Sequence, residues 1–327
     1  MTPIDTFERL ADTFALDAPT DRKRMLVIVN PYATTVSDRL KNLVVYALQG
    51  RYEVDAIDTK GKNDATAIAR EAALEGYDVV VAFGGDGTVN ETANGLLGSD
   101  TPLSCLPGGA TNVYARMLGI PNDIVDATEH LLRIADDFAP RKVDAVQVND
   151  RVFTFCAGLG LDASVTQRVD SHPRLKRRFG AYYFMYAGLS IFTRRYVARP
   201  PRMQLTLPDG RQLAGVTTLV QNADPYSYFK KLPLHMAEGA ALDSATVSGI
   251  VLKRSTPTVM PGIIYRMLAP NARLAKHRAV DDFAGVDGLV VTSSDGRGIA
   301  LQVDGDYIGD VTEARFTVLP GALTVVS

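Results

Sequence analysis

Three turns in the first part of the chain are rich in the residue types that bind phosphate groups. They are residues 30–31 (NP), residues 84–91 (GGDGTVNE) and residues 107–112 (PGGATN). Glycine lets the backbone approach an anion closely, and the N–H groups at the beginning of a helix attract negative charge. The carboxylate of Asp86 would repel a bare phosphate, so its place in such a loop indicates that a Mg²⁺ ion lies between the two.

The turn at residues 84–91 has an alternative interpretation. It lacks the Gly-Lys-Ser/Thr of a P-loop and the G-x-G-x-x-G of a dinucleotide-binding fold. By itself it is therefore explained equally well as a phosphate-binding loop or as a tight turn whose glycines are needed for packing. The other two turns favour the phosphate interpretation. All three follow apolar runs, and the carboxyl ends of parallel strands meet at one edge of a sheet.

The segments between these turns alternate between apolar runs and helical periodicity. Runs at 25–29, 52–57 and 79–83 predict strands, and apolar residues at helical spacing over 40–48 and 65–72 predict helices. This order is typical of a doubly wound, largely parallel α/β sheet. After residue 143, strand-like runs flank the turn signals at 149–150 and 208–210, which predicts a β-sandwich with helices at 181–195 and 257–268.

These patterns divide the 327 residues into two domains and an extension. We expect an α/β nucleotide-binding domain at 24–143, with 312–327 as a candidate to complete it. A β-sandwich domain follows at 144–311. Residues 1–23 are expected to form an N-terminal helical extension. A hydrophobic content of 46% is sufficient for two cores.

The composition excludes several classes of protein. The 35 Lys and Arg nearly balance the 37 Asp and Glu, which argues against general nucleic-acid binding. Cys105, Cys156 and the four histidines show no metal-ligand spacing. No segment reaches the ~18 apolar residues that a spanning helix needs, and the N-terminus lacks the apolar core of a signal peptide. We therefore expect a cytoplasmic protein.

Taken together, the three turns resemble those of the diacylglycerol kinase catalytic family, which includes bacterial diacylglycerol kinases and sphingosine kinases. The more specific part is residues 107–121 (PGGATNVYARMLGIP), because the GGDGTxNE element is shared with NAD kinases. Asp144, residues 158–162 (GLGLD) and residues 304–306 (DGD) also fall where the family has counterparts. The resemblance implies a nucleotide domain and a β-sandwich domain with the active site between them.

The resemblance also implies ATP and Mg²⁺ and assigns roles to residues of this chain. The family's proton-acceptor carboxylates fall on Asp304 and Asp306, and Asp86 joins them as a catalytic residue and metal ligand. Asp243 is the carboxylate left from a structural Mg²⁺ loop. The nucleotide contacts, with Glu91 supporting the Mg²⁺ shell, fall on Asn30, Pro31, Thr59, Gly84, Gly85, Asp86, Gly87, Thr88, Asn90, Glu91, Gly109, Thr111 and Asn112.

Residues 304–306 also have an alternative interpretation. On the sequence alone an ordinary Asp-Gly hairpin turn is favoured, and only the resemblance reverses that preference. The chain departs from the family where Asp306 replaces a glutamate and where Tyr32 and Ala33 replace a Ser-Gly pair. These departures leave open whether Asp304 or Asp306 is the base.

Residues 181–192 (AYYFMYAGLSIF) form an aromatic and aliphatic run flanked by basic residues. Such a segment can lie at a bilayer surface with its arginines against anionic headgroups. A buried helix is the alternative, and the sequence slightly favours it because the run has no strongly polar face. Lys230 and Lys231, beside three aromatic residues, are a weaker candidate. The flanking residues are Arg174, Lys176, Arg177 and Arg178 before the run and Arg194, Arg195, Arg199 and Arg202 after it.

The expected function is transfer of the ATP γ-phosphate to a lipid hydroxyl, with diacylglycerol as the leading acceptor and phosphatidic acid as the product, by a cytoplasmic protein in peripheral contact with the membrane. Two alternatives remain open. One is a NAD kinase-like phosphotransferase acting on a soluble acceptor, and the other is a catalytically weak lipid or nucleotide sensor on the same fold. The sequence leaves the oligomeric state open, including a homodimer.

Overall fold

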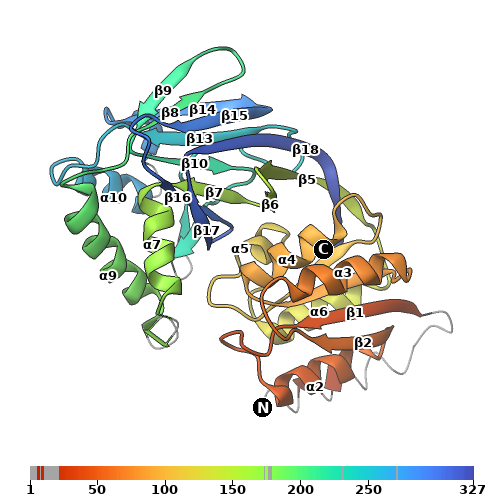
Figure 1. Cartoon of the computed structure of the whole chain (residues 1–327). Coiled ribbons are helices and arrows are strands. Elements are labelled where there is room, and N and C mark those ends of the chain that lie inside the picture. The colour runs from red at the N-terminus through yellow and green to blue at the C-terminus, as the bar shows by residue number, and fades with distance from the viewer. Residues whose placement is uncertain are drawn as a thin grey trace. The chain divides into compact units, whose positions relative to one another are not determined.

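The computed structural model describes residues 6, 7, 9, 10, 22–172, 174, 175, 179–229, 232–269 and 272–327 (Figure 1). The chain forms two compact units, unit 1 from Met1–Val143 and Gly321–Ser327 and unit 2 from Asp144–Pro320. Unit 1 thus ends at Val143, and the segment that returns to it begins at Gly321 rather than at residue 312. Most of the expected N-terminal extension lies outside the described residues, as do Lys176, Arg177, Arg178, Lys230 and Lys231.

Unit 1 is built on a parallel sheet with strand order β2-β1-β3-β4. Every residue of β3 is buried, as expected for a central parallel strand covered on both faces. The end of β18 adds to this sheet, where Val325 pairs in parallel with Leu103. The strands are β1 (Lys23–Val29), β2 (Tyr52–Asp58), β3 (Val79–Gly84) and β4 (Leu103–Pro107), and the helices are α2 (Asp38–Leu48), α3 (Asp64–Leu74), α4 (Asp86–Leu96), α5 (Val113–Met117) and α6 (Ile124–Ile134).

Unit 2 is built on antiparallel strands. One group of strands has the order β14-β13-β10-β7-β16-β17. A second group has the order β18-β15-β8-β9, and in it β5 pairs with both β18 and β6. Side chains from both sheets, such as Phe316 and Leu301, form one core. The strands are β5 (Arg141–Val148), β6 (Arg151–Phe153), β7 (Cys156–Leu159), β8 (Met203–Thr206), β9 (Gln212–Gly215), β10 (Thr217–Gln221), β11 (Ser227–Phe229), β12 (Leu232–Leu234), β13 (Val247–Leu252), β14 (Val280–Val286), β15 (Gly288–Ser293), β16 (Ile299–Val303), β17 (Asp306–Val311) and β18 (Glu313–Val325).

Two helices of unit 2 fall close to the two predicted segments, and one further helix was not predicted. The segment expected at 181–195 is an α-helix that continues into a π-helical turn, and the one expected at 257–268 begins slightly later. The described helices are α7 (Leu161–Asp170), α9 (Ala181–Ile191), the π-helical turn Phe192–Tyr196, α10 (Met260–Leu268) and the short 3₁₀ turn Leu274–Lys276. The predicted α/β domain followed by a β-sandwich is therefore confirmed.

Three polar turn signals of unit 2 form hairpins. Residues 149–150 join β5 to β6, residues 207–211 join β8 to β9, and Asp304-Gly305 joins β16 to β17. Asp304 and Gly305 have φ of 47° and 86°. Two successive residues with positive φ match the right-handed twist of a hairpin, and Asp and Gly tolerate that conformation best. Residues 304–306 therefore do form a hairpin, and the catalytic role of their carboxylates stays a prediction.

Candidate active site

The three glycine- and asparagine-rich turns meet at one edge of the unit 1 sheet. The parallel register pairs Val29 with Phe83 and Gly84 with Pro107, so β1, β3 and β4 end side by side. The backbone N–H of Asn30 donates to the Phe83 carbonyl at 2.9 Å. Thr59 reaches the same edge, because its N–H donates to the Val29 carbonyl at 2.8 Å. The predicted convergence of these turns is confirmed.

The glycines of the second and third turns pack directly against each other. A Cβ on Gly108 would lie 2.8 Å from the Cα of Gly84, and a Cβ on Gly109 would lie 2.7 Å from the Cα of Gly85. Real Cβ contacts are essentially never that short, so only glycine allows this approach of backbone to backbone. Packing therefore accounts for these glycines, and it also brings the backbone groups of both turns to one place.

Two asparagines fix the shape of these turns. Asn30 donates from Nδ2 to the hydroxyl of Thr88 at 3.0 Å, and its Oδ1 accepts from the N–H of Tyr32 at 3.0 Å. Asn112, with φ of 50°, accepts from the N–H of Gly109 at 2.8 Å and donates back to the Gly109 carbonyl at 2.9 Å. The turns are thus held in place by side chains of the same edge.

Asp86 is the first residue of α4, directly after the Gly84-Gly85 turn. It is half-buried, and its Oδ1 accepts a hydrogen bond from the N–H of Tyr114 at 3.2 Å. Glu91 lies further along α4 and is also half-buried, whereas Asn90 is buried. The positive end of the α4 dipole favours an anionic group at this point. One edge of the sheet therefore holds the following predicted nucleotide residues, with the Asp86 carboxylate among them: Asn30, Thr59, Gly84, Gly85, Asp86, Gly109 and Asn112.

In unit 2, Asp304 is buried and its carboxylate accepts four hydrogen bonds. Oδ2 accepts from the N–H and the hydroxyl of Thr154 at 2.7 and 2.8 Å, and Oδ1 accepts from the N–H groups of Phe155 and Cys156 at 3.0 Å each. Burial raises the pKa of the Asp304 carboxyl, and these hydrogen bonds oppose that rise. Four acceptor positions are about the full capacity of a carboxylate. Asp304 thus anchors the segment between β6 and β7.

Asp306 has a different environment from Asp304. It is the first residue of β17, pairs with Val303 across the hairpin, and is half-buried rather than buried. The two carboxylates that the sequence offered as equivalent candidates are therefore not equivalent in the fold.

The chain is similar to curated diacylglycerol kinases. It is 32% identical over 244 residues to the diacylglycerol kinase of Bacillus subtilis (strain 168), with 71% of this chain and 75% of the relative covered. It is 29% identical over 298 residues to that of Staphylococcus aureus (strain MRSA252), with 88% and 87% covered. Residues 24–148 match the diacylglycerol kinase catalytic domain. The chain belongs to the diacylglycerol kinase catalytic family.

Solved structures share the fold of this family member. A crystal structure from Bacillus anthracis strain Sterne has a TM-score of 0.73 at 23% identity and covers 95% of this chain and 97% of its own. A diacylglycerol kinase structure from the same strain has a TM-score of 0.67 at 20% identity, with 94% and 98% covered. As a member of a kinase family, the chain is a phosphotransferase, and the family implies ATP as the donor. Among the described residues, no helix is long and apolar enough to cross a bilayer.

A polar network braces the Asp304-Gly305 turn of this kinase. Gln302 donates from Nε2 to Oδ2 of Asp162 at 2.8 Å, and its Oε1 accepts from the N–H of Gly305 at 2.8 Å. The hydroxyl of Tyr226 donates to the other oxygen of Asp162. Burial raises the pKa of Asp162, while the hydrogen bonds from Tyr226 and Gln302 lower it. The sequence offered no signal for Gln302 or Tyr226, because only the strand register brings them to Asp162.

The loop around Asp243 shows no metal-binding arrangement. Asp243 is exposed, and the loop is held instead by the buried Asp144, whose Oδ2 accepts from the N–H of Ala245 at 2.6 Å and whose N–H donates to the Leu242 carbonyl at 2.6 Å. No group of three or more His, Cys, Asp or Glu side chains that could hold a metal occurs among the described residues. The metal-ligand role of Asp243 stays a prediction.

Proposed function

We propose that this kinase transfers the γ-phosphate of ATP to the hydroxyl of a lipid, with diacylglycerol as the first candidate acceptor and phosphatidic acid as the product. The observation that carries the proposal is that the three glycine- and asparagine-rich turns and Asp86 meet at one edge of the unit 1 sheet. The lipid acceptor is supported by the curated relatives, which are diacylglycerol kinases.

Unit 1 supplies the groups that a triphosphate needs. The N–H groups at the beginning of α4 and the positive end of its dipole are suited to phosphate oxygens. The residues at this edge also fit a Mg²⁺ ion, because the half-buried Asp86 carboxylate stands at the beginning of α4. Asp86 would hold that ion together with phosphate oxygens, and the bound ion would spread the charge of the γ-phosphate. Glu91 would support it from the same helix.

Unit 2 supplies the base. The acceptor oxygen forms a bond to the γ-phosphorus, the bond from phosphorus to the β–γ bridging oxygen breaks, and ADP leaves. The hydroxyl proton passes to a carboxylate, for which we choose Asp306 because Asp304 already accepts four hydrogen bonds. Asp304 instead fixes the turn that directly precedes Asp306.

A transfer assay with radiolabelled ATP, Mg²⁺ and a panel of lipids tests this function, with NAD as a soluble acceptor in parallel. We expect labelled phosphatidic acid from diacylglycerol. Asp306→Asn is expected to lower turnover by ~10²-fold or more while leaving ATP affinity unchanged. Asp86→Ala is expected to abolish Mg²⁺-dependent ATP binding. Labelled NADP would establish the soluble-acceptor alternative, and ATP binding without any labelled product would favour a sensor.

A further inference from the structure

The peptide groups on both sides of Asp306 are held by side chains. The N–H of Gly305 donates to Oε1 of Gln302 at 2.8 Å. The N–H of Tyr307 donates to Oδ2 of Asp170 at 3.4 Å, a longer and weaker bond. Asp306 is the one residue between these two N–H groups, so the backbone that carries its carboxylate is fixed before and after it. A carboxylate on fixed backbone has fewer orientations than one on a free turn.

Packing alone does not account for a glutamine at residue 302. Only 1% of Gln302 is exposed, and burying a polar side chain costs free energy unless its amide is hydrogen-bonded. A backbone N–H can only donate, so the amide oxygen must face Gly305 and the amide nitrogen must face Asp162. The register of β16 against β17 also shifts at Gln302, and β-bulges of this kind re-aim side chains next to active sites.

The residue opposite Gln302 on β7 is Gly158, and it leaves the space that this amide occupies. A Cβ on Gly158 would lie 2.9 Å from Nε2 of Gln302 and closer still to Oδ2 of Asp162. The segment 158–162 thus supplies both the space for Gln302 and, in Asp162, the acceptor that orients its amide.

Both holding contacts lead to one helix, α7. Asp162 stands in its first turn and Asp170 is its last residue. The helix packs against both β16 and β17. Eight residues of α-helix place these two carboxylates about 12 Å apart along its axis. The helix that the sequence did not predict therefore holds the β16–β17 hairpin at two separate points.

Helix α9 supports α7 in turn. Tyr183 and Ala187 of α9 pack with Val165 and Val169 of α7, and Figure 1 shows the two helices side by side. Other side chains of α9 lie outside this contact, among them Leu189, which is 65% exposed. The buried-helix interpretation of this apolar run is therefore correct only for the face that meets α7. This packing limits the movement of α7 relative to the hairpin.

We propose that Gln302 and Asp170 are positioning residues, which hold Asp306 where its carboxylate accepts the proton of the lipid hydroxyl. Both act through the backbone on either side of the base, not by contact with the substrate. The proposal rests on the proposed function, which chooses Asp306 as the base. Displacing a reacting group by about 1 Å can lower a rate ~10²-fold, so the loss of these hydrogen bonds has a large effect on turnover.

The first test replaces Gln302 with methionine, which has a similar length but cannot donate to Asp162. In the lipid transfer assay, Gln302→Met should lower kcat at least ~10-fold and leave the ATP affinity unchanged in calorimetric titration. Gln221→Met is the matched control. Gln221 is another buried glutamine of unit 2, which donates to the Ala223 carbonyl at 3.0 Å and accepts from the N–H of Ala237 at 2.8 Å. The control should lose stability to a similar extent but keep its kcat.

A double variant tests whether Gln302 acts through Asp306. Asp306→Asn alone is expected to lower turnover ~10²-fold, and adding Gln302→Met should change the residual rate by less than ~2-fold. Losses that multiply would mean that Gln302 acts on the reaction independently of Asp306, and they would overturn the positioning role.

Asp170 provides a second test with its own rescue, and it decides the question if Gln302→Met is unfolded. Asp170→Ala should lower kcat at least ~3-fold with ATP affinity unchanged, a smaller loss because its hydrogen bond to Tyr307 is longer. Asp170→Asn should restore most of that loss, since its amide oxygen can still accept from the N–H of Tyr307. Equal kcat values in the alanine variant and the unaltered protein would contradict the role of Asp170.

Amide hydrogen exchange separates this proposal from the proposed function, because it requires no activity. The amide of Gly305 should exchange at least ~10-fold faster in Gln302→Met than in the unaltered protein. If that variant keeps its kcat, the positioning role is overturned, even when diacylglycerol is phosphorylated. If the unaltered protein phosphorylates no lipid, the proposed function falls, and faster exchange in the variant still supports the holding of Asp306.

Discussion

Thr154 and Asp304 are joined by two hydrogen bonds, from the backbone N–H and the hydroxyl of Thr154 to one oxygen of the Asp304 carboxylate. They lie 150 residues apart in the sequence, so these bonds tie the β16–β17 hairpin to the segment before β7. This relationship makes Asp304 part of the framework of unit 2 and leaves Asp306 as the reactive candidate.

The first prediction concerns the stability of the hairpin. Asp304→Asn keeps a residue that tolerates positive φ, so its effect comes from the lost acceptor and the lost charge rather than from backbone strain. The amide nitrogen cannot accept from Thr154, and we expect the free energy of unfolding to fall by about 3 kcal/mol. Urea unfolding followed by circular dichroism measures it. Asp306→Asn serves as the control and should cost less than about 1 kcal/mol; equal losses in the two variants would contradict the assignment.

The second prediction concerns the contact between the two glycine turns. In Gly109→Ala the new Cβ would lie 2.7 Å from the Cα of Gly85, so the turns must separate. We expect ATP affinity to fall by at least ~10-fold and stability by about 1–3 kcal/mol. Gly61→Ala is the matched control, because a Cβ at that residue would meet nothing within 4 Å. Calorimetric titration with ATP measures both variants, and equal affinities would show that the spacing of these turns is irrelevant to the nucleotide.

The third prediction concerns pH and Asp162. Because the folded protein raises the pKa of Asp162, it holds this proton to a higher pH than the unfolded chain does. This contribution to stability is complete below the ordinary carboxyl pKa of about 3.9 and is lost as the pH rises through the raised value. The variant Asp162→Asn lacks this proton-linked contribution to stability. The stability of the unaltered protein relative to this variant, measured by urea unfolding, should therefore decrease as the pH rises above about 4. A constant difference would contradict the raised pKa.

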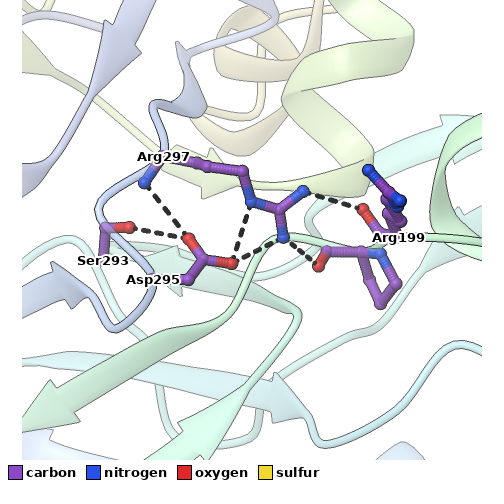
Figure 2. Close-up of polar contacts among 5 residues, drawn as sticks. Arg199, Ser293, Asp295 and Arg297 are labelled. Carbon is purple, nitrogen blue, oxygen red and sulfur yellow. Dashed lines mark hydrogen bonds and ion pairs between the residues drawn. The ribbon is translucent and has the colours of Figure 1, made fainter.

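The fourth prediction concerns the hydrogen bonds by which Arg297 holds the segment that follows α9 (Figure 2). Arg297→Ala removes the hydrogen bonds to the carbonyls of Arg199 and Pro200. The segment that precedes Arg199 should then unfold locally more often. Trypsin should therefore cleave after Arg194 or Arg195 about 10-fold faster than in the unaltered protein. Mass spectrometry of the fragments with time measures this rate. Arg211→Ala removes a similarly exposed arginine that pairs with Asp209 in another hairpin, and it should leave the rate unchanged.

The sequence predicts the parts of the site that local pattern determines. Asn30 and Gly84 each follow an apolar run, and parallel pairing then requires that they meet at one edge. The turn at Asp304-Gly305 is equally local, because two residues suited to positive φ specify a hairpin. In these places one short segment carries the whole signal.

Features that depend on distant segments could not be predicted. The burial of Asp304 depends on Thr154, and the contact of Gln302 with Asp162 depends on the register of β16 against β7. The exposure of Leu189 also depends on a distant segment of the chain. Both faces of α9 are apolar in sequence, and only the position of α7 decides which one is covered.

The path of β18 has a consequence for how the protein is made on the ribosome. Residues 321–327 belong to unit 1, where the N–H of Gly98 donates to the Ala322 carbonyl and the N–H of Val326 donates to the Leu103 carbonyl. These residues are translated after all of unit 2. The nascent sheet of unit 1 must therefore wait with an unpaired β4 edge until translation has passed the entire sandwich, and that open edge exposes it to aggregation in the interval.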